Sequence, residues 1–73
     1  MRKEDYPETD PRHHVANIHG MLDHLLNHCR EDVARVSEPK AQALFETTAE
    51  VLGGLKTAYE HYASGKERGM ARS

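Results

Sequence analysis

Six histidines are the side chains of this 73-residue chain best suited to bind a metal or carry a proton. Five of them lie between residues 13 and 28. His24 and His28 are four residues apart, and in a helix this spacing places two imidazoles on one face. Glu31 and Asp32 follow within about one turn, and either carboxylate could supply a third ligand. Because this ligand set suits zinc, nickel, copper or iron, these four residues form the first candidate metal site.

The known catalytic patterns are missing from the sequence. The segment from His24 to His28 lacks the glutamate of the His-Glu-x-x-His metalloprotease motif, and with it the general base. The Glu-x-x-His pattern of di-iron bundles is absent as well. Cys29 follows His28, but neighbouring helical residues point about 100° apart, so we expect a small buried residue there instead of a nucleophile. We therefore predict a protein that is not an enzyme.

Two helical segments of equal length must position these side chains. Both segments open on a proline, and they run over residues 11–36 and 39–64 with only two residues between them. Asp10 is a suitable N-cap for the first segment, and Gly65 is a suitable left-handed residue after the second. So short a join predicts an all-α, antiparallel two-helix hairpin over residues 10–65. We expect residues 1–9 to form a disordered N-terminal arm and residues 66–73 a flexible basic tail.

The hairpin suggests a second group of histidines at its open end. With the join centred on residues 37 and 38, level partners have numbers that add to 75, so His14 faces His61. His13 then lies beside them, and the three histidines form the second candidate metal site. His19 and Asp23 are four residues apart, and we expect a partly buried histidine paired with that carboxylate. The competing interpretation for all six is a solvated or structural side chain without a bound metal.

Apolar residues recur at helical spacing in both segments, which indicates amphipathic helices. The expected seam between the helices consists of Val15, Ile18, Leu22, Leu25, Cys29 and Val36 against Leu44, Thr48, Val51, Leu55, Tyr59 and Tyr62. The flank that a single hairpin would leave in water consists of Met21, Leu26, Val33, Phe45 and Leu52. Covering such a flank is worth several kcal/mol at about 25 cal/mol per Å². We therefore expect a homo-oligomer, with a two-fold dimer that forms a four-helix bundle as the simplest case.

Gly53 and Gly54 interrupt the second helical segment. Two glycines inside a helix cost roughly 1–2 kcal/mol relative to alanine, which predicts a tolerated weak point or a kink. The alternative is a surface of close helix approach, because Ala49, Gly53 and Thr57 are small residues spaced four apart.

The composition excludes several classes of function. The net charge is −2 and no folded face is strongly basic, which argues against nucleic-acid binding. No apolar run approaches the roughly 20 residues of a membrane span, and no signal peptide is visible, so we expect a cytoplasmic protein without membrane contact. The predicted function is a small self-associating helical protein whose first candidate activity is divalent-metal binding. The alternative is a scaffold or adaptor module that binds another protein and no metal.

Overall fold

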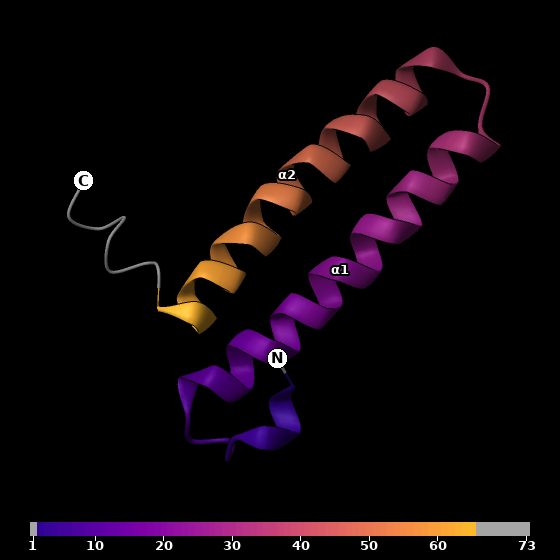
Figure 1. Cartoon of the computed structure of the whole chain (residues 1–73). Coiled ribbons are helices and arrows are strands. Elements are labelled where there is room, and N and C mark those ends of the chain that lie inside the picture. Colours follow the sequence, from indigo (N-terminus) through magenta and orange to yellow (C-terminus); the bar gives the residue numbers. More distant parts are fainter. Residues whose placement is uncertain (1, 66–73) are drawn as a thin grey trace, which may run out of the picture.

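The computed structural model describes residues 2–65 and consists of two long helices packed side by side (Figure 1). A 3₁₀ turn, η1, covers Lys3–Asp5, helix α1 covers Pro11–Arg35 and helix α2 covers Pro39–Ser64. The expected helical hairpin is confirmed, and its helices differ from the predicted ranges only in that Val36 lies outside α1. The predicted flexible tail, residues 66–73, lies outside the described residues.

Local sequence signals define where the helices begin and end. The Asp10 carboxylate accepts a hydrogen bond from the Arg12 amide at 2.9 Å, and Pro11 occupies the first helical position, so the predicted N-cap is confirmed. At the C-terminal end of α2, Gly65 has a φ of 81° and its amide donates to Tyr62 O. Glycine adopts this left-handed conformation at little cost, which confirms the predicted C-terminal residue.

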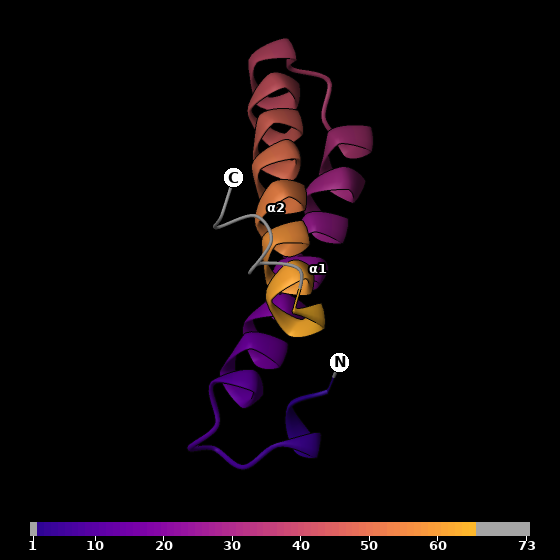
Figure 2. The ribbon, with the colours of Figure 1, turned by 60° about the vertical axis from the view of Figure 1, so that its left-hand side comes forward.

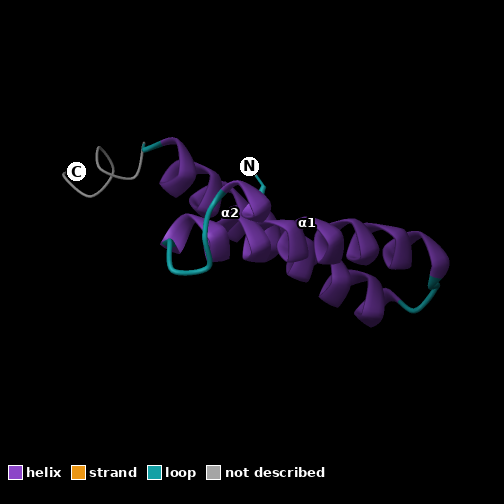
Figure 3. Ribbon diagram, turned by 90° about the horizontal axis from the view of Figure 1, so that it is seen from below, coloured by secondary structure: helices purple, strands orange, loops and turns teal. Residues whose placement is uncertain are grey.

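The join between the helices is short and leads directly into a proline. Val36 and Glu38 are both extended, and Pro39 opens α2 without needing an amide partner. The Gln42 side-chain amide donates to Val36 O at 2.7 Å and so ties the first turn of α2 to the end of α1. Figures 2 and 3 show α1 and α2 lying side by side, and the one other helical element among residues 2–65 is η1.

The N-terminal segment, which we expected to be a disordered arm, folds back along the first turns of α1 (Figure 1). The Arg12 guanidinium carbon lies 4.4 Å from the centre of the Tyr6 ring, a cation–π contact between this segment and α1. Ala16, on the α1 side beneath this segment, is 6% exposed. The segment therefore covers part of α1 that α2 does not reach.

The core between the helices is small. Leu26, Cys29 and Leu52 are buried, and Leu22 and Ala49 pack against them. The prediction that Cys29 is a small buried residue is confirmed, since it is a free thiol only 8% exposed. With so few side chains buried, large apolar residues such as Leu44 and Val51 remain in contact with water.

The predicted seam of the second helix is wrong. Leu26 and Leu52, which were expected to remain in water, are the centre of the core at 4% and 8% exposure. Leu44 and Val51, which were expected in the seam, are 62% and 57% exposed. The apolar arc of each helix is wider than one partner helix can cover, and the spacing of the residues does not reveal which part of the arc turns inward. One apolar surface does stay uncovered, but of the predicted flank only Met21 is exposed.

Candidate functional site

The first candidate metal site lies on the outer side of α1. His28 Nε2 is 3.2 Å from Asp32 Oδ2, one helical turn further along. His24 and Glu31 are exposed, and no contact of either with the other candidate ligands is seen. A histidine paired with a carboxylate on a solvated helix surface is also a common structural arrangement. The geometry brings together two of the four predicted ligands.

The three histidines of the second candidate site have different surroundings. His13 Nδ1 lies 2.8 Å from Lys3 O and 3.1 Å from Tyr6 O, and His14 Nε2 lies 2.7 Å from Glu8 O. A carbonyl oxygen only accepts, so each of these ring nitrogens carries a proton and donates it.

His13 and His14 therefore attach the N-terminal segment to α1, and their rings lie edge to face at 5.1 Å. His61, the third member of the predicted cluster, is partly buried on α2. Within residues 2–65, no three histidine, cysteine, aspartate or glutamate side chains are arranged to hold a metal ion. The structure thus does not gather the three histidines into one ligand set.

Two polar pairs join the helices along one face of the hairpin. His19 Nε2 is 2.8 Å from Glu60 Oε2, and Lys56 Nζ donates to Asp23 Oδ1 at 2.6 Å. The expected pairing of His19 with Asp23 is therefore wrong, because each of them has a better-placed partner on α2. The hydrogen bond from Lys56 lowers the pKa of Asp23, and the hydrogen bond from His19 lowers the pKa of Glu60. We call this side of the hairpin the polar face.

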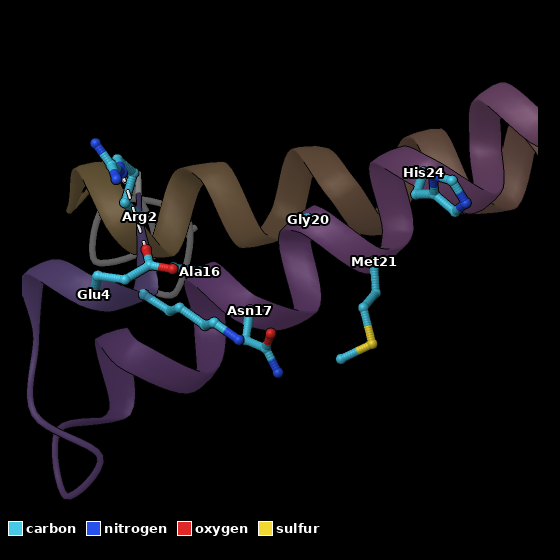
Figure 4. A pocket seen from close by; sticks show the side chains of 8 residues that line it. Arg2, Glu4, Ala16, Asn17, Gly20, Met21 and His24 are labelled. Atoms are coloured by element: carbon cyan, nitrogen blue, oxygen red, sulfur yellow. Dashed lines mark ion pairs between the residues drawn. The ribbon is translucent and has the colours of Figure 1, made fainter.

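A groove of about 590 Å³ lies where the N-terminal segment crosses α1 (Figure 4). Arg2 and Glu4 face each other there at 3.9 Å, while Asn17 and Met21 project from the same side of α1. His24 lies at the far end of this groove. The polar groups that line it are solvated and do not converge on one point, so the groove lacks the arrangement expected of a small-molecule site.

The largest unexplained feature is a group of exposed apolar side chains, which we call the apolar face. Each of them is between 37% and 62% exposed. Three come from α1 and four from α2: Ile18, Met21 and Leu25, and Leu44, Val51, Leu55 and Tyr62. Their spacings are three, four or seven residues, so they form one stripe on each helix.

Both stripes lie on the same side of the hairpin. At about 100° per residue, each stripe is displaced by roughly 50–130° from the core-facing direction of its own helix, in the same rotational sense along the chain. When two right-handed helices run antiparallel and face each other, displacements in the same rotational sense point to the same side of the pair. Residues of the polar face, such as Asp23 and Glu60, are displaced in the opposite sense. The hairpin therefore has one polar and one apolar face.

The apolar face continues into a groove at the open end of the hairpin. This groove has a volume of about 340 Å³ and is lined by Val15 of α1 together with Ala58, Tyr59 and Tyr62 of α2. The residues of the apolar face were visible in the sequence as a stripe at helical spacing. Six of the seven were assigned to the seam inside the hairpin, and only Met21 was expected on an uncovered surface.

Comparison with known proteins adds no further information on function: no family model, no curated protein and no solved structure matches this chain. Among residues 2–65, neither α1 nor α2 has the length and apolar character that crossing a membrane requires.

Proposed function

We propose that this chain is a non-enzymatic, self-associating helical protein, and that its apolar face binds the apolar face of a second copy to form a four-helix bundle. One observation carries the proposal: the hairpin exposes seven large apolar side chains on one face, more than it buries between its helices. Contiguous apolar patches of this kind on small proteins mark interaction sites. The remaining charges of the polar face then stay in water.

The energetics favour covering this face. Fully burying a large apolar side chain is worth about 2 kcal/mol, so seven side chains that are about half exposed represent about 7 kcal/mol for each chain. The α2 stripe from Leu44 to Tyr62 is about 27 Å long at 1.5 Å per residue, which gives two hairpins a continuous surface of contact. A second copy matches this surface in length and in its lack of charge, and it is present wherever the chain is made.

Self-association is tested by the mass of the protein in solution. We expect light scattering or sedimentation to give twice the monomer mass at about 100 μM, a concentration at which even an interface worth about 6 kcal/mol associates. Val51→Glu places a charge in the apolar face and should return the protein to the monomer mass. Ala43→Glu, on an exposed outer position of α2, is the matched control and should leave the mass unchanged.

The size of the expected Val51→Glu effect follows from the burial of Val51 in the dimer. Val51 is 57% exposed, so two copies lose about 2 kcal/mol of burial in the variant, which weakens association about 30-fold. The desolvation of two carboxylates adds to that loss. A wild-type protein that stays monomeric at about 100 μM would contradict self-association and would leave the adaptor function, in which the apolar face binds a different protein.

Divalent-metal binding is the second part of the proposal, and the 3.2 Å separation of His28 and Asp32 supports it, with His24 one turn earlier. Titration calorimetry with zinc and with nickel should show binding to the wild-type protein. The double variant His24→Ala, His28→Ala should lose that binding, and the control His13→Ala, His14→Ala should keep it. Equal affinities in all three proteins would remove the metal from the proposed function.

A further inference from the structure

We infer that the two copies pair around a two-fold axis perpendicular to the helices, so that α2 lies antiparallel against α2 of the second copy. This inference rests on the proposed self-association and specifies its geometry. It follows from the different lengths of the two exposed stripes and from the order of the residues within the α2 stripe.

The two stripes differ in length by more than a factor of two. On α1 the exposed apolar residues extend only from Ile18 to Leu25, whereas on α2 they extend from Leu44 to Tyr62. The α1 stripe is continued by polar residues at both ends. Asp32 lies seven residues after Leu25, and an exposed histidine lies four residues before Ile18. An apolar surface as long as that of α2 is therefore found only on another α2 helix.

The α2 stripe is also symmetrical along its own length. Successive members, Leu44, Val51, Leu55 and Tyr62, are separated by seven, four and seven residues. When such a stripe is turned end for end, every member meets another member. Around an axis level with residue 53, Leu44 faces Tyr62 of the second copy, and Val51 faces Leu55 of the second copy. In an isologous two-fold contact each residue pair occurs twice, so this order places apolar side chains opposite apolar side chains along the whole stripe.

The rival arrangement places α2 of one copy against α1 of the other, around an axis parallel to the helices. In the hairpin, His19 meets Glu60 and Asp23 meets Lys56, which sets the relative level of the two helices. At that level Leu44 would lie over the turn of α1 that runs from Asp32 to Arg35, whereas Leu55 and Tyr62 would lie near Leu25 and Ile18. The end of the α2 stripe at Leu44 would then bury an apolar side chain against charged groups, which is unfavourable.

The groove at the open end supplies an independent observation. Val15, Ala58, Tyr59 and Tyr62 line a space of about 340 Å³, which is ample for one leucine side chain. The perpendicular axis brings Leu44 of the second copy to the level of Tyr62 and so to this groove. Leu44 is the most exposed member of the apolar face at 62%, and the groove gives it a place in which to be buried.

Site-directed crosslinking tests the arrangement. All variants carry Cys29→Ala, and each carries one new cysteine: Leu44→Cys, Tyr62→Cys or Asp32→Cys. A short bismaleimide joins thiols about 10 Å apart, whereas the perpendicular axis separates each of positions 44 and 62 from its own symmetry mate by about 27 Å. Mixing Leu44→Cys with Tyr62→Cys should therefore give a crosslinked dimer at about ten times the yield of either variant alone, because facing helices lie about 8–10 Å apart.

The controls separate the geometry from self-association. Each cysteine variant must keep the helical circular dichroism and the dimer mass of the Cys29→Ala parent before it is crosslinked. Efficient crosslinking of Leu44→Cys with Asp32→Cys, or the absence of the 44–62 product from a protein of dimer mass, overturns the perpendicular axis and leaves self-association in place. A parent protein of monomer mass overturns both.

Discussion

Replacing Gly53 and Gly54 with alanine should stabilise the protein substantially. Neither glycine has a positive φ, so an L-residue fits the backbone at both positions. A Cβ atom added at either position has no heavy atom within 4 Å in the hairpin. The substitutions therefore gain helix propensity and reduce the freedom of the unfolded chain without a steric cost.

The expected gain is about 1 kcal/mol for each glycine, or about 2 kcal/mol for the double variant. For a chain of this size, 1 kcal/mol shifts the melting temperature by about 4–8 °C, so the double variant should melt about 8–16 °C higher. Urea unfolding followed by circular dichroism at one fixed protein concentration checks the value. The midpoint should rise while the slope of the unfolding free energy against urea stays constant.

Gly65→Ala is the matched control for this prediction. Gly65 has a φ of 81°, and alanine in a left-handed conformation costs about 1 kcal/mol, so this variant should lose stability although its Cβ also meets open space. A double variant at Gly53 and Gly54 that loses stability would refute the reasoning. It would show that the surface with Ala49 and Thr57 is used for close helix approach between copies, the alternative that the spacing of small residues suggested.

Three further predictions concern the N-cap of α1, the core between the helices and the stability of the protein at acid pH. Asp10→Ala removes the N-cap of α1, so the melting temperature measured by circular dichroism should fall, whereas Asp10→Ser should restore most of it. Leu26→Ala should cost about 2–4 kcal/mol of unfolding free energy in dilute protein, and Leu44→Ala less than about 1 kcal/mol, because they are 4% and 62% exposed; equal losses would contradict the observed core. Hydrogen bonds lower the pKa of Asp10 to about 2 and also lower the pKa values of Asp23 and Glu60. Because folding lowers these pKa values, their stabilising contribution is present above about pH 4 and is lost as the pH falls through the folded-state values. A melting temperature that stays constant from about pH 5 to pH 2 would contradict this linkage.

The parts of the structure that could be predicted from the sequence are those set by local chemistry. Pro11, Pro39 and Gly65 define helix ends through their own backbone geometry, and each of these positions behaves as expected. The hairpin follows in turn, because a join of two or three residues leaves two long helices little choice except to lie antiparallel. None of these inferences depends on which residues meet across the chain.

The rotation of each helix about its own axis could not be predicted in the same way. The apolar arc on α2 includes both Leu52 and Val51, and the pattern alone does not say which of them faces α1. The pairs that distinguish the two are His19 with Glu60 and Lys56 with Asp23, and their members are 41 and 33 residues apart. Such long side chains can pair with several neighbours, so their partners are known only once the helices are placed.

That rotation also decides what the second surface can do. With Leu52 inward, the hairpin buries a short central cluster and turns the symmetrical stripe from Leu44 to Tyr62 outward. With the opposite rotation, the outward residues of α2 would be Phe45, Leu52 and Tyr59, which are each separated by seven residues. A stripe spaced seven and seven also meets itself when reversed, but it has three members and extends over 14 residues, whereas the exposed stripe has four members and extends over 18. The helix rotation seen in the structure therefore leaves the longer of the two self-complementary stripes exposed, which is why we assign that surface to a second copy of the chain.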